Sequence, residues 1–270
     1  MSKTIFAFCH IPKAGGTTLA NILKSQYTSD QIISVGPIKN SINFKELKAK
    51  NSNYFNDKKI ILGVHFKFGI HKLITPNEIS VKYFTFLREP VSRIVSLYYY
   101  IKSNPNHQHY NRIINNKISL KEFVSSDMTL ELDNWMIRQL ANIKAEDRQI
   151  NQEHLVKCQE ILESHFAMVG IMENFNDDLI KLADILNWDS PPFYLKANVN
   201  KRKPKKEKIS QEVLNSIQER NKYDIRLYNN ILNLRNDSLV DSKTKEFEIK
   251  NRLYNMPKTK LIDLIYKYER

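Results

Sequence analysis

The chain has 270 residues, which is long enough for one well-buried domain with additions. Its 42 Lys and Arg against 29 Asp and Glu give a formal net charge of +13, so the surface attracts acidic partners such as acidic glycans, nucleic acids or anionic lipids. Only two cysteines, Cys9 and Cys158, argue against a disulfide framework, and neither lies in a metal-binding pattern.

No stretch of the sequence approaches the roughly 20 apolar residues that a membrane span requires, so we expect no integral membrane segment. The apolar run from Ile5 to Ile11 is short and lacks a cleavage-like ending, which is not typical of a signal peptide. If Met1 is the natural start, we expect a cytoplasmic protein.

The segment from Thr4 to Lys24 predicts a strand, a glycine turn and a helix in succession. Ile5 to His10 is apolar and too short for a typical helix, and a helical pattern begins at Thr17 and fades near Tyr27. A helix start leaves backbone N–H groups unpaired, and Lys13 adds a full charge, so the turn predicts a phosphate or sulfate site. The alternative is that the glycines only turn the chain and that Lys13 is a solvated charge.

The turn does not match the Walker loop, in which a Lys-Ser/Thr pair follows the last glycine. Here Lys13 comes before Gly15 and Gly16. A phosphotransferase of the P-loop type stays open as an alternative function, although no aspartate clearly ends an apolar strand to hold Mg²⁺.

Further apolar runs predict three more strands, over Lys58–His65, Tyr83–Leu87 and Phe166–Met172. Residues 28–58 are polar, and we interpret them as a loop with a minor helix near Phe44–Lys50. Helical patterns lie between the strands and over residues 210–235. This alternation predicts an α/β fold with a mostly parallel central sheet flanked by helices.

A second phosphate-binding pattern follows the predicted strand that ends at Leu87. Pro90 suits the first turn of a helix, and Ser92 and Ser96 then lie on one helix face because they are four residues apart. The guanidinium of Arg88 offers a fork suited to phosphate. The alternative is a surface arginine followed by a tolerated serine.

The words HIPKAGGTTL and FTFLREPVSRIVSLYYY resemble carbohydrate sulfotransferases related to heparan sulfate 2-O-sulfotransferase. Weaker resemblances are VGIMENFNDDL and DNWMIRQLA, the second of which lies near the acceptor site in that family, although its polar residues also suit a solvated helix face. The likeness covers roughly residues 4–235. It implies a P-loop-like sulfotransferase fold that moves the sulfuryl group of 3′-phosphoadenosine-5′-phosphosulfate (PAPS) to a sugar hydroxyl, without a metal.

The resemblance also implies which residues bind the nucleotide. Lys13 would meet the leaving oxygen, and the loop that surrounds it would hold the 5′-phosphate through Ala14, Gly15, Gly16, Thr17 and Thr18. Arg88 and Ser96 would share the 3′-phosphate. Lys201 and Arg202, in a basic run after an Asn-Val-Asn entry, would contact phosphate from a loop that folds over the nucleotide.

For the base that takes the acceptor's proton we select His65, at the end of a predicted strand, because an imidazole titrates near working pH. Relatives place a histidine after a glycine in this segment, whereas this sequence has Gly63-Val64-His65. His71 is the second candidate, and Glu89 the third. We expect His10 to orient backbone.

We assign residues 1–236 to the sulfotransferase domain and residues 237–270 to a charged, helical C-terminal extension. The +13 charge also allows a basic module that binds nucleic acid or an anionic surface. Readers of single-stranded nucleic acid interleave aromatic and basic residues, and the run from Lys201 to Lys208 has no aromatic residue. We therefore expect no nucleic acid, and the resemblance implies a carbohydrate acceptor, with acidic glycans as candidates.

Overall fold

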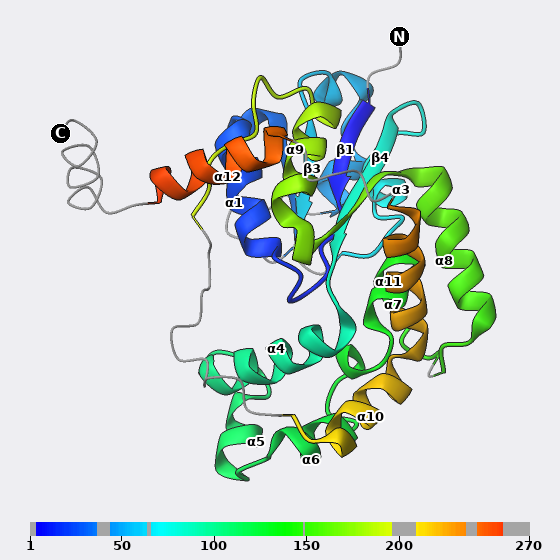
Figure 1. The fold of residues 1–270 in the computed structure, drawn as a ribbon. Helices are drawn as coiled ribbons and strands as arrows, with labels where there is room; N and C mark the ends of the chain where they lie inside the picture. The colour runs from blue at the N-terminus through cyan, green and yellow to red at the C-terminus, as the bar shows by residue number, and fades with distance from the viewer. Residues whose placement is uncertain are drawn as a thin grey trace, which may run out of the picture.

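A computed structural model describes residues 4–36, 44–63, 66–147, 149–195, 209–235 and 242–255. Figure 1 shows a central sheet with helices on both faces and a separate layer of helices beside the carboxyl ends of the strands. Within the described residues, no helix is both long enough and apolar enough to cross a membrane.

The sheet contains five strands, all parallel, in the order β2-β3-β1-β4-β5. Their bounds are β1 Thr4–Phe8, β2 Ile32–Val35, β3 Ile60–Gly63, β4 Ser80–Leu87 and β5 Phe166–Ile171. The register sets Phe6 of β1 opposite Ile60 on one side and Lys82 on the other. The predicted α/β class with a parallel sheet is confirmed.

Helices α1 to α8 lie in the connections between successive strands, as parallel strands require, and α9 to α12 follow β5. They are α1 Gly16–Gln26, α2 Phe44–Lys48, α3 His71–Ile74, α4 Pro90–Ser103, α5 Tyr110–Asn115, α6 Leu120–Ser125, α7 Trp135–Leu140, α8 Gln152–His165, α9 Phe175–Ile185, α10 Gln211–Arg220, α11 Lys222–Leu234 and α12 Ser242–Tyr254. Short 3₁₀ turns are η1 Ser29–Gln31, η2 Ser52–Phe55, η3 Leu130–Leu132 and η4 Met172–Asn174.

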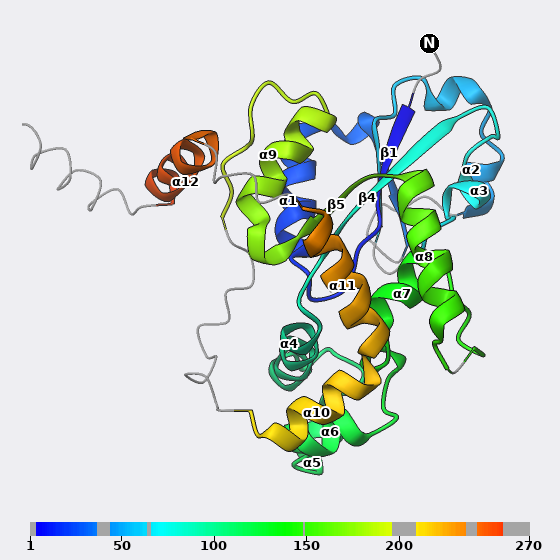
Figure 2. The same cartoon turned by 45° about the vertical axis from the view of Figure 1, so that its right-hand side comes forward.

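Alternating side chains of the strands fill a core on each face of the sheet. One face packs against α7, α8 and α11, with Met136, Cys158 and Leu227 as examples. The other face packs against α1 and α9, where Leu23 and Leu179 are fully buried. Figure 2 shows the two groups of helices on opposite sides of the strands.

A third core lies away from the sheet, within the layer of α4, α5, α6 and α10 (Figure 2). Ile94, Leu97 and Ile101 of α4 supply one side of it, and Phe123 of α6 and Ile217 of α10 the other. A capping box opens α6, since the Glu122 carboxylate accepts from the Ser119 amide at 2.7 Å. Helix α4 therefore connects the sheet to this helical layer.

Strand β2 lies inside residues 28–58, so the interpretation of that segment as a loop with a minor helix was wrong there. Strand β2 lies at the edge of the sheet, so only Ile33 and Val35 are buried and its other two side chains are half exposed. Helix α12 packs on α9, and Phe247 contributes to the core on that face. Cys9 and Cys158 are free and buried, and burial raises the pKa of Cys9 to about 12.

Candidate active site

The predicted anion loop follows β1, which lies between β3 and β4 at the centre of the sheet. In open parallel sheets, ligands bind outside the carboxyl ends of the strands at such a point, where neighbouring connections diverge. The Thr85 hydroxyl of β4 donates to the Cys9 carbonyl at 2.7 Å and fixes the exit of β1. The chain then turns through Lys13, with φ 69°, and Gly15, with φ 72°, into α1.

Two glycines are required in this loop by close approach. A Cβ on Gly16 would lie 1.9 Å from Nε2 of His10, and one on Gly15 would lie 2.3 Å from the Met172 sulfur. The His10 ring thus packs against the start of α1. Gly15 also needs its left-handed φ, which side chains rarely adopt.

The start of α1 has the features of an anion site. Gly15 is the N-cap, no side chain caps the helix, and no acidic residue lies in its first turn. The positive end of the helix dipole therefore faces the loop with no negatively charged side chain of the first turn beside it. Ala14 and Thr18 are buried and Thr17 is exposed, so the two threonines present their side chains in different environments.

Arg88 joins the second predicted phosphate site to this loop. Its Nη1 donates to the backbone carbonyl of Lys13 at 3.0 Å. Burial lowers the pKa of Arg88, while the charges of Glu173 and Glu89 oppose that shift. Arg88 stays charged, because a guanidinium ordinarily titrates far above neutral pH. The structure thus brings together Lys13 and Arg88, two residues predicted from separate motifs. Ser96 lies two turns into α4 and is half-buried.

The Lys13 ammonium lies over an aromatic ring that the sequence motifs did not single out. Its Nζ is 3.7 Å from the ring centroid of Tyr100, on the last turn of α4. The signal was present in the spacing, since Ser92, Ser96 and Tyr100 succeed one another at intervals of four and share one helix face. The face of α4 that carries Ser92 and Ser96 therefore also carries the ring that contacts Lys13.

Glu89 is the N-cap of α4. Its two carboxylate oxygens accept from the Val91 amide at 2.9 Å and the Ser92 amide at 2.7 Å. Glu173 accepts from the Glu89 amide at 3.2 Å and from the Tyr228 hydroxyl at 3.0 Å. These contacts hold the start of α4, and hence Arg88, at the end of β4.

A family model described as "Sulfotransferase family" matches residues 2–229. The chain belongs to the sulfotransferase family. No curated protein sequence matches it. Among solved structures, mouse sulfotransferase SULT7A1 complexed with PAP is similar at 17% identity and a TM-score of 0.40. That likeness covers 70% of this chain and 61% of the mouse chain, so this sulfotransferase-family chain spans less than two thirds of its neighbour.

Three predicted site residues of this family member, His65, Lys201 and Arg202, lie outside the described residues. Val64 also lies outside them, whereas Gly63 and Phe66 on either side are described. Gly63 ends β3 beside Val35 of β2, and the Phe66 carbonyl lies 4.0 Å from Sγ of Cys9, which follows β1.

His71, the second candidate base, begins α3. Its Nδ1 lies 2.7 Å from the Tyr83 hydroxyl, and burial lowers the pKa of its imidazole to about 4, with Lys72 and His165 adding smaller effects. Tyr83 pairs with Ala7 inside β1 and with Phe166 at the start of β5. His71 is therefore bound to the body of the sheet, whereas Lys13 and Arg88 follow the carboxyl ends of their strands.

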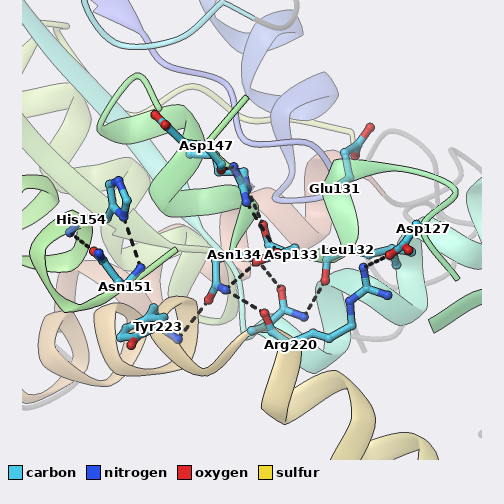
Figure 3. Close-up of polar contacts among 12 residues, drawn as sticks. Asp127, Glu131, Leu132, Asp133, Asn134, Asp147, Asn151, His154, Arg220 and Tyr223 are labelled. Atoms are coloured by element: carbon cyan, nitrogen blue, oxygen red, sulfur yellow. Dashed lines mark hydrogen bonds and ion pairs between the residues drawn. The ribbon is translucent and has the colours of Figure 1, made fainter. Parts of the chain in front are cut away.

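The segment DNWMIRQLA places its three polar residues in the interior: Asn134 is 4% exposed, and Arg138 and Gln139 are each 1% exposed. The alternative that these residues lie on a solvated helix face is therefore wrong. Asn134 accepts from the Tyr223 and Asp224 amides, both at 3.0 Å, and donates to the Arg220 carbonyl at 2.7 Å (Figure 3). These bonds fix the start of α7 against the junction of α10 and α11.

Proposed function

We propose that this protein is a sulfotransferase that moves the sulfuryl group of PAPS to a hydroxyl of a carbohydrate acceptor. The observation that carries the proposal is the bond from the Arg88 guanidinium to the Lys13 carbonyl, which unites two cationic motifs at the centre of the sheet edge. Membership of the sulfotransferase family supports the reaction class.

The residues present fit a nucleotide with two separate phosphates. The start of α1, together with Thr17, Thr18 and Lys13, suits the 5′-phosphosulfate, because the positive end of a helix and an ammonium attract an anion, and no acidic residue lies in the first turn. Arg88 and Ser96 suit the 3′-phosphate, for which a guanidinium offers a two-pronged contact. Lys201 and Arg202 are proposed to add contacts from their own loop.

Bound PAPS would supply an activated sulfuryl group, whose S–O bond to the phosphate breaks as a new S–O bond to the acceptor oxygen forms. The role of Lys13 is to stabilise the negative charge that develops on the departing phosphate oxygen. We assign to the imidazole of His65 the removal of the acceptor's hydroxyl proton. The proton is then held on the histidine, so charge and atoms balance.

The carbohydrate acceptor rests on the resemblance of the loop and Arg88 motifs to carbohydrate sulfotransferases and on the net charge of +13. Positive surfaces attract acidic substrates and raise their local concentration. A phosphotransferase of the P-loop type would instead use ATP and Mg²⁺, which makes the nucleotide the discriminating ligand.

The test is the thermal stability of the full chain with different nucleotides. A ligand at one hundred times its Kd stabilises the folded state by about 2.7 kcal/mol. We expect adenosine 3′,5′-bisphosphate to raise the Tm by several degrees and adenosine 5′-monophosphate, which lacks the 3′-phosphate, to raise it less. A shift with ATP and Mg²⁺ but none with adenosine 3′,5′-bisphosphate would contradict the proposal.

A further inference from the structure

A cavity of about 770 Å³ opens on the face of the sheet that carries α7 and α8. Its volume is within the range of sites that bind small molecules, roughly 300–1,000 Å³. Most of the wall is apolar and comes from the end of β2, the segment before α3, α3 itself and α8, with Val35, Phe66, Phe68, Ile70, Leu73 and Ile161. Leu73 is 56% exposed, so part of this apolar wall faces solvent.

Among the residues that the structure describes, the charged side chains that line this cavity are Lys67, Lys72 and Lys157. Lys72 and Lys157 are exposed, and Lys67 donates from Nζ to the Ile143 carbonyl, which fixes its position. Burial and the charge of Arg138 lower the pKa of Lys67, and the charge of Glu146 opposes them. Asn142 is the only neutral polar side chain among the described residues that line the cavity, so lysine side chains outnumber neutral polar ones in this part of the wall.

The cavity reaches the edge of the sheet where the candidate active site lies. Val35, which lines it, pairs with Gly63 at the end of β3. Phe66, which also lines it, follows His65 in the sequence and has its carbonyl against Cys9, the residue after β1. The part of the cavity that Val35 and Phe66 line therefore lies at the carboxyl ends of β2 and β3, and β3 is the neighbour of β1 in the sheet.

We infer that this cavity binds the acceptor, and that the acceptor is an acidic sugar carried on an apolar or aromatic group. The inference rests on the proposed function and specifies its substrate class. A carboxylate or sulfate would be attracted by the ammonium groups of Lys67, Lys72 and Lys157. An aromatic or alkyl group would pack against the rings of Phe66 and Phe68. A neutral sugar fits poorly, because its hydroxyls need more hydrogen-bond partners than this wall provides.

The experiment compares three probes on the full chain by calorimetry: 4-nitrophenyl β-D-glucuronide, 4-nitrophenyl β-D-glucoside and free glucuronic acid. The glucoside lacks the charge, and the free acid lacks the aromatic group. We expect the aryl glucuronide to bind at least tenfold more tightly than either of the others. Equal affinity for the glucuronide and the glucoside would overturn the inference.

A charge-reversal pair locates the binding. The double variant Lys72→Glu/Lys157→Glu should bind the aryl glucuronide about tenfold more weakly than wild type, because two exposed charge contacts are reversed. Its affinity for the aryl glucoside should be unchanged. The matched control is Lys24→Glu with Lys181→Glu, which makes the same change in net charge on α1 and α9, across the sheet. Equal weakening by both pairs would mean a general charge effect and would overturn the site.

The nucleotide is measured separately, by the Tm shift with adenosine 3′,5′-bisphosphate, in wild type and both double variants. A nucleotide shift without a preference for the glucuronide contradicts the cavity assignment alone. Absence of the nucleotide shift in wild type contradicts the proposed function, and the acceptor role of the cavity falls with it.

Discussion

Arg88 is both a cation and a support for the loop, because the guanidinium that would meet a phosphate also donates to the Lys13 carbonyl. Arg88→Ala should therefore reduce the free energy of binding of adenosine 3′,5′-bisphosphate by about 1.5–3 kcal/mol, the range for hydrogen bonds to charged groups. Arg88→Lys should recover only part of that loss, since an ammonium lacks the fork. Titration calorimetry measures both. Arg112→Ala, at an exposed position of α5, is the control, and equal affinity of Arg88→Ala and wild type would end the assignment.

Tyr100 is a positioning residue for Lys13, since its ring holds the ammonium at 3.7 Å. A cation over an aromatic ring at an exposed site gains about 0.5–1 kcal/mol. Tyr100→Leu should lower kcat about two- to fivefold and leave nucleotide affinity unchanged, whereas Tyr100→Phe keeps the ring and the wild-type kcat. Lys13→Ala should lower kcat far more than either, with a smaller effect on nucleotide affinity. Equal kcat values for the Leu and Phe variants would contradict this role.

The assignment of His65 as the base has less support from the sequence than the other site residues, because Val64 separates it from Gly63. His65→Ala should lose about 10²–10⁴-fold in turnover, keep its affinity for adenosine 3′,5′-bisphosphate, and lose the acid limb of the pH-rate profile. His71→Ala should lose much less, because its imidazole is bound to Tyr83. If the two variants exchange behaviours, the alignment of this segment is wrong. If both keep the acid limb, Glu89→Gln is the next variant to measure.

At the level of elements, the junction of β1 and α1 depends on the absence of a side chain at Gly16. Gly16→Ala should destabilise the fold by about 1–3 kcal/mol and remove the nucleotide-dependent Tm shift, because the new methyl group overlaps the His10 ring. The double variant His10→Ala/Gly16→Ala removes the obstacle and should regain the lost stability. Urea unfolding measures both variants, and no recovery in the double variant would show that the overlap is not the cause. Asn21→Ala, exposed on the same helix, is the control.

Elements with strong local patterns were predictable from sequence, and elements held by tertiary contacts were not. Strand β4 and helix α4 follow from an apolar run that ends in Arg-Glu-Pro. Strand β2 was missed because only Ile33 and Val35 are buried in a polar segment, and its hydrogen bonds come from β3. Helix α7 ends at Leu140, although apolar residues at helical spacing continue to Ile143, which packs into the core from the following turn.

The same division holds for the site. Glycines, Lys13 and Arg88 could be found from sequence because each lies at the end of a strand that has its own local signal. The contact between Lys13 and Tyr100 could not, since it depends on how α4 passes the loop. Burial of Arg138 and Gln139 was likewise set by the neighbouring α11 and by the segment before α3, which the pattern of α7 alone does not contain.

For the whole molecule, His71 makes stability depend on pH. Burial lowers its pKa to about 4, below the ordinary histidine value of about 6.5, so the unfolded chain binds more protons between these two values. Stability is therefore lost as the pH falls from about 6.5 towards about 4. Because the side chain is half-buried, the effect should be about 1 kcal/mol. Urea unfolding at pH 7 and pH 5 should show a smaller difference for His71→Gln than for wild type; identical differences would contradict the assignment.

The parallel order of the strands also constrains how the protein is made. Strand β1 pairs with β3 and β4, so Phe6 can pair only after Ile60 and Lys82 have been synthesised. At a synthesis rate of about 5–20 residues per second, β1 leaves the ribosome several seconds before either partner exists. During that interval the apolar residues of β1 are exposed and its edges are unpaired, a state that favours aggregation. The cationic loop after β1 is likewise completed only when Arg88 has been synthesised and β4 has paired with β1.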